Sequence, residues 1–493
     1  MRAALLLEGP HVRRRLTSLG LMAAIVVAAA LLTIFTVRDN RTGLIMALAL
    51  LVASLVFVDA GRRDFFVKLG WIPYAWIALC FSPELRFTFR SALDTSIAST
   101  GLETFAQVGI YALVALLVVR TRRLLVTADP RTIRKGPLAA WPLLALISTM
   151  WSPIPLFTLV RSLQLFAPIG LAIVMVRIWL SSPSLAASLW RDTLRFFVRT
   201  VTFLTLVGIA TSSQSGIGTG YRFAWPGTHP GVVAVFCATA LLILVASGRS
   251  YLGVRLSGFV FRVLLFASAI YLSQTRAVLA ALAVAIAVLI WWKGRTNPAS
   301  RYIGAFYYVV AVTLVSFAAW DQILRYLERG ASLQENLSLT GRLPLWGMAI
   351  DLISDADRWL IGFGYGSGRV ILPLHAEWAG TAHNSWIELL MSIGVVGPLL
   401  LAASLLFVLR HAPSIGSIAS PPLALSVLAL LTVTSLTGEQ FALPGMGFTL
   451  LALMYVPVLV TRNVSLPGTP GSQTYRRGGD ARSRPRPYTV VGS

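Results

Sequence analysis

The sequence predicts an all-α polytopic membrane protein with about 14 (12–14) transmembrane helices. Three observations lead to this class. Of the 493 residues, 56% are hydrophobic and only 12% are charged, whereas about 25% of a typical soluble chain is charged. The apolar residues occur in runs of roughly 16–25, which is long enough to cross a hydrocarbon core of about 30 Å. The chain also lacks the segments of about ten alternating residues from which transmembrane β-barrels are built.

The predicted spans follow these apolar runs along the chain. The first run is too long for the core of a signal peptide and lacks a convincing cleavage site, so we expect it to be retained as a span. The two cysteines, Cys80 and Cys237, lie inside apolar runs and are expected to be small buried residues, with neither a disulfide nor a metal. In order, the spans are expected near residues 18–37, 43–60, 65–81, 104–119, 137–151, 160–180, 196–211, 231–247, 256–272, 276–292, 303–320, 384–408, 422–437 and 444–460.

The distribution of Arg and Lys predicts the orientation of these spans. An even number of spans puts both termini on one side, and that side carries about 29 basic residues against about 12 on the other. The positive-inside rule therefore predicts that both termini are cytoplasmic. A net charge of +23 would suggest nucleic acid in a soluble protein. Here the location of the charge matters more than its sum, and no nucleic-acid partner is expected.

The spans divide the chain into five regions. The longest loop contains "LPLWGMAIDLI", in which Leu345, Ala349, Ile350 and Ile353 recur at helical spacing. We therefore expect a short helix there, on the membrane surface or against the bundle. The regions are a cytoplasmic N-terminal segment (1–17), transmembrane helices 1–11 (18–320), an extracytoplasmic loop with the short helix (321–382), transmembrane helices 12–14 (383–460) and a disordered basic cytoplasmic tail (461–493).

A histidine at the start of the twelfth span is the strongest candidate for chemistry. In "HNSWIELLMSIGVVG", His383 opens an apolar run, and Asn384 or Ser385 can cap the helix. The positive end of the helix dipole favours a neutral imidazole, which can accept a proton from an attacking hydroxyl. The competing interpretation is a polar anchor at the membrane interface. Gly394 and Gly397 are expected to let a neighbouring helix approach closely.

Three arginines near the same outer face are candidates for binding a diphosphate. Arg276 lies between two spans with almost no loop, Arg222 lies in "GTGYRFAWPGTHPG", and Arg342 lies in "LTGRLPLW". The planar fork of arginine suits phosphate oxygens. Each arginine taken singly is also compatible with a surface or lipid-headgroup contact. His229, in the same loop as Arg222, lies at this face as well.

The acidic residues and the glycine-rich segment allow further expectations. Glu388 and Glu439 are candidates to orient His383 or to pair with an arginine. "IGFGYGSGR", which ends at Arg369, is expected to be a flexible turn, because no strand of a βαβ unit precedes it as a nucleotide loop requires. No HExxH, no CxxC pair and no carboxylate cluster with metal spacing occurs on the outer side. No metal or cofactor is therefore expected.

His383 and Asn384, followed after nine residues by Gly394 and Gly397, resemble the signature of the bacterial O-antigen ligase and O-antigen polymerase superfamily. "LTGRLPLWGMAIDLI" and "SQTRAV" resemble the segment that precedes this signature and the family's arginine between spans. "RFAWPGTHPGVVAV" is similar to its loop motif, except that the family more often has Asn where Gly231 stands. The resemblance runs over roughly residues 205–410.

This resemblance implies a GT-C-like bundle with a long extracytoplasmic loop in the bacterial plasma (inner) membrane. It implies a metal-independent inverting glycosyltransferase, which moves a glycan from a polyprenyl-diphosphate carrier to a hydroxyl of a glycan, lipid or envelope acceptor at the outer face. His383 would then activate the acceptor, and Arg222 and Arg276 would hold the diphosphate. The other expected substrate-binding residues are Arg342, Asn384, His229 and Glu439.

Two alternatives remain open at the level of sequence. A polymerase of the same superfamily adds the glycan to another lipid-linked unit, whereas a ligase attaches a finished glycan to a lipid or envelope component. The single long loop late in the chain favours the ligase. A non-enzymatic flippase or exporter of lipid-linked sugars would show charged residues deep in several spans and an internal repeat, and neither is clear in this sequence.

Overall fold

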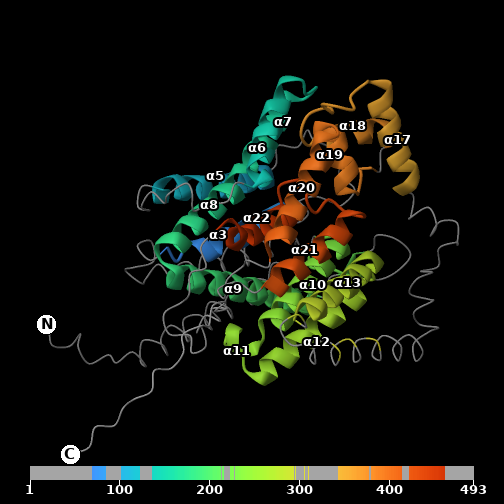
Figure 1. Cartoon of the computed structure of the whole chain (residues 1–493). Helices are drawn as coiled ribbons and strands as arrows, with labels where there is room; N and C mark the ends of the chain where they lie inside the picture. The colour runs from blue at the N-terminus through green and yellow to red at the C-terminus, as the bar shows by residue number, and fades with distance from the viewer. Residues whose placement is uncertain are drawn as a thin grey trace, which may run out of the picture.

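In the computed structural model, the described residues fold into α-helices, short 3-10 helices at Ser82–Glu84, Pro137–Ala139 and Ser148–Met150, and one short β-hairpin (Figure 1). Several predicted segments lie outside the described residues. They are the N-terminal segment, the spans near 18–37 and 43–60, nearly all of the span near 303–320, and the tail. The structure describes residues 69–84, 102–122, 136–211, 214–215, 222–226, 228–293, 295, 302, 305, 309, 342–376, 379–412 and 421–460.

Four described segments are long and apolar enough to cross a membrane, and several shorter apolar helices accompany them. The protein is therefore mostly helical with several candidate spans, while the predicted count of about 14 is not confirmed. The long segments are α7 (Pro155–Gln164) continued by α8 (Phe166–Ser181), α9 (Pro183–Ala210), α10 (Pro230–Ser247) and α13 (Arg276–Lys293). The shorter apolar helices are α3 (Ile72–Phe81), the Gln107–Thr121 part of α5 (Leu102–Arg122), α6 (Ala140–Ile147) with its flanking turns, α12 (Leu256–Leu272), α20 (Val396–His411), α21 (Pro421–Ser435) and α22 (Met446–Leu459).

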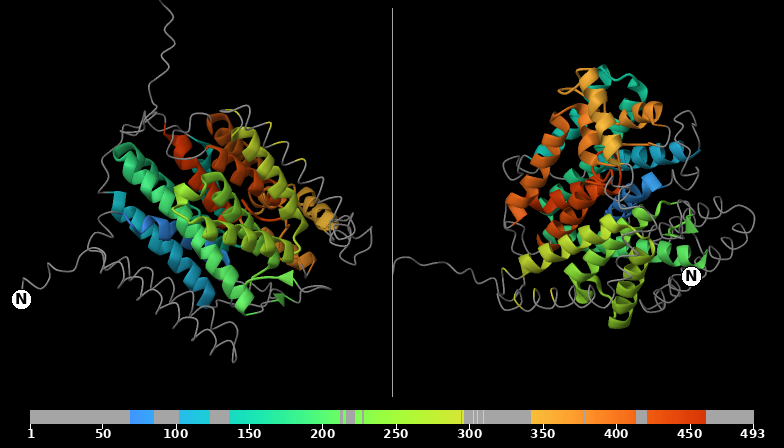
Figure 2. Two further views of the ribbon diagram at one scale, coloured as in Figure 1. Left: turned by 90° about the horizontal axis from the view of Figure 1, so that it is seen from below. Right: turned by 90° about the vertical axis from the view of Figure 1, so that its right-hand side faces the viewer.

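Helix α10 is the central helix of the bundle. It begins at Pro230, whose fixed φ suits the first helical position, and it ends before Gly248, which has a φ of +77°. Between these ends its side chains are apolar and mostly buried. Helices α9, α12, α13 and α21 pack around it, and the left view of Figure 2 shows the long helices running side by side. This arrangement buries α10 on nearly all sides, as its uniform apolar composition requires.

A cluster of aromatic rings joins α10 to two of its neighbours. The ring centroid of Phe236, in α10, lies 4.3 Å from that of Phe81, in α3, and 5.9 Å from that of Phe197, in α9. All three side chains are buried. Contacts between such rings add to the free energy of burial, so this cluster fixes the relative positions of three helices.

Helices α17 (Arg342–Asp355), α18 (Gly368–His375) and α19 (Ser385–Ile393) form a separate group at one end of the bundle (Figure 1). Leu345, Ala349 and Ile353 of α17 are fully buried in a second apolar cluster, which confirms the helix expected in the long loop. Ile350, which belongs to the same helix, is 38% exposed and does not join this cluster. It lies one position beyond Ala349, which turns it about 100° away from the buried stripe.

The segment predicted as one span near 384–408 is two helices, α19 and α20, which separate at Gly394. This glycine has a φ of +66°, and a Cβ there would collide with the backbone of Leu360. The next residue, Val395, donates its N–H to the carbonyl of Trp359 at 2.8 Å. The neighbour that Gly394 admits is therefore a loop, and not the helix that we expected. The loop can approach because its backbone finds hydrogen-bond partners at the helix break.

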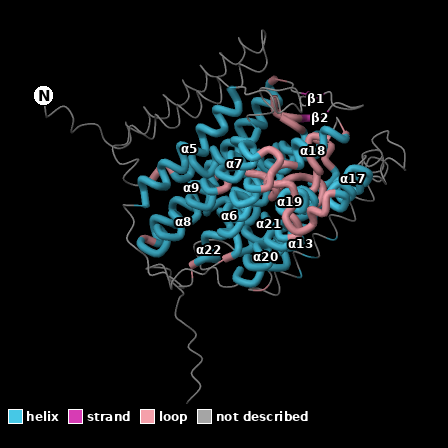
Figure 3. Tube along the Cα trace, turned by 90° about the horizontal axis from the view of Figure 1, so that it is seen from above, coloured by secondary structure: helices cyan, strands magenta, loops and turns pink. Residues whose placement is uncertain are grey.

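The glycine-rich segment that ends at Arg369 wraps around this break. Phe363 donates its N–H to the carbonyl of Met391 at 2.6 Å, and Gly364 donates to the carbonyl of Ser392 at 2.8 Å. The segment is a turn, as expected, but these backbone bonds hold it in one conformation. Figure 3 shows the loops gathering around α18 and α19 at this end of the molecule.

Candidate active site

His383 lies in the loop that leads into α19 and is half-buried beside the first turn of that helix. Its φ of +50° lies in the left-handed region, where few residues other than glycine are found, and such strain is concentrated at functional sites. The next residue, Asn384, caps α19 through its Oδ1, which accepts the N–H of Trp386 at 2.9 Å and that of Ile387 at 3.3 Å. The cap expected from the sequence is therefore confirmed for Asn384.

The surroundings of His383 keep its imidazole neutral. Burial lowers the pKa of His383 below its ordinary value of 6.5. The Glu439 carboxylate acts in the opposite direction and raises this pKa, whereas the positive charges of Arg342 and Arg369 lower it further. The imidazole is therefore mainly neutral near pH 7. Its free ring nitrogen can then accept a proton, which is what a general base must do.

An ion pair beside the histidine joins Arg369 to Glu439. Nη2 of Arg369 lies 2.9 Å from Oε2 of Glu439, and both side chains are largely buried. Arg369, in the first turn of α18, was not among the expected site residues. The only local signal was a lone arginine at the end of the glycine-rich turn. The two partners are 70 residues apart in the chain, so no local pattern reveals the pair.

Glu388 lies fully buried in α19, close to the residue that precedes the histidine. Its Oε2 accepts the N–H of Ala382 at 3.2 Å, while Oε1 has no hydrogen-bond partner among the described residues. A Cβ at Gly368 would lie 2.5 Å from this Oε1. Glycine is therefore needed there to let α18 approach the carboxylate. Glu388 holds the loop of His383 against α19.

The first residue of α19 also fixes the position of the acidic residue Glu439. Ser385 donates its hydroxyl to the carbonyl of Gly438 at 2.9 Å and accepts the N–H of Phe441 at 3.2 Å. These two bonds hold the loop after α21 against the start of α19. That loop carries Glu439, so the same serine brings the carboxylate toward His383.

A second group of expected site residues lies at the turn between α12 and α13. Arg222 belongs to β2 (Arg222–Phe223), which pairs antiparallel with β1 (Gln214–Ser215). Its Nε donates to the carbonyl of Ser273 at 2.9 Å, and its Nη2 donates to Oγ1 of Thr275 at 3.2 Å. Arg222 therefore holds two residues of the turn that leads directly into Arg276.

Arg276 and His229 complete this second group. Arg276 is the first residue of α13, an 18-residue helix. His229 caps α10, because its Nδ1 accepts the N–H of Gly231 at 3.1 Å. A Cβ at Gly231 would lie 3.8 Å from the Cγ2 atom of Thr275, so the start of α10 lies against the same turn.

The expected site residues thus fall into two sets. The set around α19 gains Arg369 and also contains the candidate Glu388, and its charged members act on one another electrostatically. The charges of Arg222 and Arg276 are not among those that shift the pKa of His383. The first set is His383, Asn384, Arg342 and Glu439; the second is Arg222, His229 and Arg276.

The described residues contain no group of three or more His, Cys, Asp or Glu side chains placed to hold a metal ion. The two cysteines are free and buried, as expected from their apolar surroundings. Phosphate chemistry at this site would be served by the arginine side chains, whose guanidinium groups bind phosphate oxygens directly.

Glu439 should set the pH at which His383 becomes neutral. We expect Glu439→Gln to lower the pKa of His383, because it removes the carboxylate that stabilises the protonated ring. The acid limb of the kcat–pH profile, already centred below pH 6.5, should move to lower pH by roughly one pH unit. The profile is measured for turnover with purified protein. In Arg342→Gln the limb should move to higher pH, and identical limbs in both variants would contradict the assignment.

Fold and site together define an integral membrane protein of α-helices, with a neutral histidine and arginine side chains gathered at helix ends. Residues 261–402 match the family model described as O-antigen ligase. This segment therefore supports the O-antigen ligase superfamily, and the resemblance seen in the sequence is confirmed over it. The match includes His383, Arg276 and Arg342, and it leaves out Arg222 and Glu439. No curated protein matches the chain.

Proposed function

We propose that this protein is a metal-independent inverting glycosyltransferase that transfers a glycan from a polyprenyl-diphosphate carrier to an acceptor hydroxyl. One observation carries the proposal: a neutral, half-buried histidine at the start of α19, surrounded by Glu439, Arg369 and Arg342. The O-antigen ligase domain over residues 261–402 supports the same reaction class. We further propose that the protein lies in the bacterial plasma membrane with both termini cytoplasmic, and that the site faces outward.

The reaction needs one proton transfer and one displacement. A ring nitrogen of His383 takes the proton of the acceptor hydroxyl while the hydroxyl oxygen bonds to the anomeric carbon of the donor sugar. The bond between that carbon and the diphosphate oxygen breaks, and the diphosphate leaves with the electron pair. A single displacement of this kind inverts the anomeric configuration. Positioned general bases typically contribute a factor of about 10²–10⁴ to the rate.

Arginine side chains at helix ends are suited to the leaving diphosphate. Arg276 is the first residue of α13, and the free backbone N–H groups at a helix start also favour an anion. Arg222 holds the turn that precedes Arg276 and so positions it. Arg342 begins α17 and acts electrostatically on His383. Positive charges fixed before the reaction stabilise the charge that develops on the diphosphate.

A repeat-unit polymerase is the second candidate, because it would use the same donor and the same base. The two enzymes differ only in the acceptor, which is another lipid-linked unit for the polymerase. The family match fits both enzymes, and the single long loop late in the chain favours the ligase. A non-enzymatic flippase is a weaker candidate, since it gives no role to a neutral base beside an ion pair.

Sizing of lipid-linked glycans separates these candidates. Polyprenyl-linked glycans are extracted from cells with and without the gene and are analysed by mass spectrometry. For a ligase, we expect long glycans to accumulate on the carrier when the gene is absent. Single repeat units accumulating on the outer face would instead identify the polymerase. Single units confined to the cytoplasmic face would reject both transferases and support the flippase.

A further inference from the structure

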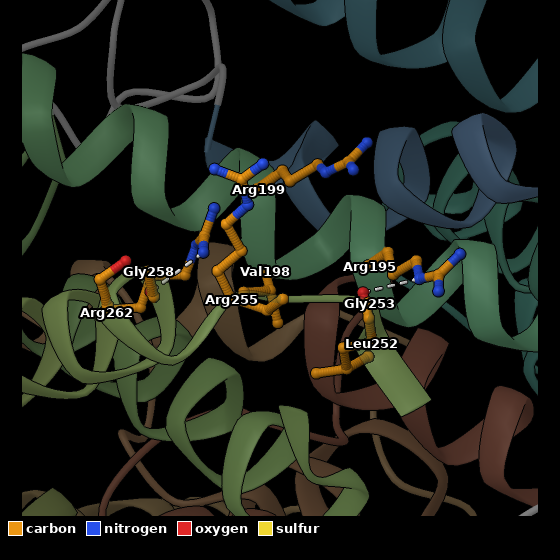
Figure 4. A pocket seen from close by; sticks show the side chains of 10 residues that line it. Arg195, Val198, Arg199, Leu252, Gly253, Arg255, Gly258 and Arg262 are labelled. Carbon is orange, nitrogen blue, oxygen red and sulfur yellow. Dashed lines mark hydrogen bonds between the residues drawn. The ribbon is translucent and has the colours of Figure 1, made fainter. Parts of the chain in front are cut away.

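A pocket lies at the opposite end of the molecule from α17, α18 and α19. It is formed by α9, by the end of α11 (Arg249–Leu252) and by the first turns of α12 (Figure 1). Its volume is about 270 Å³. Figure 4 shows the side chains that line it, among which four are arginines. These are Arg195, Arg199, Arg255 and Arg262.

One of these arginines is already bound within the protein. Arg195 donates from Nε to the carbonyl of Leu252 at 2.8 Å and from Nη2 to the carbonyl of Tyr251 at 3.2 Å. It also pairs with Asp192 at 3.4 Å. A Cβ at Gly253 would lie 2.8 Å from Nη2, so this glycine lets the arginine reach across the end of α11. Arg195 therefore builds one wall of the pocket.

The other three arginines carry charge that nothing in the described part of the chain neutralises. The guanidinium groups of Arg199 and Arg255 are exposed and make no hydrogen bond or ion pair with any described residue. Arg262 donates from Nη1 to the carbonyl of Gly258 at 3.0 Å, and its buried Nε has no partner. Among the described residues, no Asp or Glu lines the pocket. Three like charges close together favour a bound anion.

The N-terminus of α12 adds a second feature that favours an anion. The residue before the helix, Arg255, makes no side-chain cap, and the first turn contains no acidic residue. The first-turn residues Ser257 and Gly258 line the pocket. Backbone N–H groups of a first turn have no partner inside the helix, and the positive end of the helix dipole lies there. Phosphate groups bind readily at such helix ends.

An apolar stripe on α12 indicates where the rest of the ligand lies. Leu256, Val260, Phe261 and Leu264 follow one face of the helix and are 45% to 62% exposed. The stripe starts at the pocket and continues along α12, one of the shorter apolar helices. Exposed apolar side chains at this spacing suit hydrocarbon chains. The pocket is also slightly smaller than the roughly 300–1,000 Å³ of sites for drug-sized ligands, which fits a headgroup better than a nucleotide.

We propose that this pocket binds the phosphate of an anionic phospholipid headgroup, and that the acyl chains lie along the exposed face of α12. Arg199 and Arg255 contact the phosphate directly, together with the N–H groups at the start of α12. Arg262 adds a third positive charge to the pocket. Basic pockets between membrane helices are suited to anionic lipid headgroups. The site is independent of the glycan-transfer reaction, because it lies at the other end of the helices.

Lipid retention by purified full-length protein tests this proposal. The protein is re-lipidated with dioleoyl-phosphatidylglycerol or dioleoyl-phosphatidylcholine, and bound lipid is measured by native mass spectrometry. We expect the wild-type protein to retain phosphatidylglycerol preferentially. Arg199→Gln/Arg255→Gln should lower the affinity for phosphatidylglycerol by roughly tenfold or more. These two side chains are exposed and make no bond with any described residue, so the variant should fold.

The matched control removes the same charge elsewhere. Arg249→Gln/Arg410→Gln replaces two exposed arginines that do not line the pocket, and it should retain the lipid as the wild type does. Equal retention by all three proteins would overturn the proposal. So would complete displacement of the lipid by millimolar inorganic phosphate, because the pocket would then recognise a free phosphate compound. Loss of phosphatidylglycerol in the pocket variant alone supports the lipid site.

Discussion

His383→Asn is expected to lower the rate of glycan transfer by about 10²–10⁴-fold while leaving the protein folded. Asparagine adopts positive φ more readily than most residues, so it should keep the backbone conformation that His383 has at φ +50°. Its amide cannot take a proton from an acceptor hydroxyl. Release of polyprenyl diphosphate from a lipid-linked donor, followed under single-turnover conditions, measures the effect on chemistry alone.

The matched control for this variant is His375→Asn. His375 ends α18, is exposed, and its side chain makes no hydrogen bond with any described residue. The same exchange there should leave the rate within about twofold of the wild type. If His383→Asn transfers glycan at the wild-type rate, the histidine is an interfacial anchor and the proposed mechanism is wrong. Loss of folded His383→Asn protein is detected separately by size-exclusion chromatography.

Gly394→Ala is expected to have the largest effect on stability, lowering the free energy of unfolding by about 3 kcal/mol or more. Two costs add at this position. The glycine has a φ of +66° and a ψ of −163°, a conformation that is essentially restricted to glycine. A Cβ would also collide with the backbone of Leu360, which cannot move without breaking the bonds of the glycine-rich turn. Thermal unfolding in detergent, followed by tryptophan fluorescence, measures the change.

A glycine in α17 provides the control for this substitution. Gly347 is helical, and a Cβ there would meet nothing within 4 Å. Gly347→Ala should therefore be neutral or stabilising, by up to about 1 kcal/mol. Equal melting temperatures for Gly394→Ala and the wild type would show that the turn yields easily. Such a result would contradict the role that we assign to the glycine-rich turn, which is to hold α19 and His383 in place.

The two predictions are linked through the position of α19. The glycine-rich turn bonds to Met391 and Ser392, at the end of the helix that begins just after His383. Because α19 is only nine residues long, a shift at its end also moves its start. A partly folded Gly394→Ala protein should therefore lose activity as well as stability, whereas His383→Asn loses activity alone.

The sequence by itself determined the properties that depend on neighbouring residues. Long apolar runs predicted the helices, and the run near 231–247 corresponds to α10 within one residue at its start. Helical spacing in the long loop identified α17, whose Leu345, Ala349 and Ile353 form its buried stripe. The Asn384 cap was also local, since its bonds reach only two and three residues ahead. Hydropathy, helical spacing and capping act over one or two turns and can be read from a short window.

Only the tertiary structure decided which distant charges meet. Arg369 pairs with Glu439 across 70 residues, and together they change the protonation of His383. The break at Gly394 depends on the loop that packs against it, and the arginine pocket joins α9 to the start of α12. An apolar run looks the same whether its helix continues or breaks against a neighbour. The physical reason is that electrostatic and packing energies depend on distance in space, which separation along the chain does not specify.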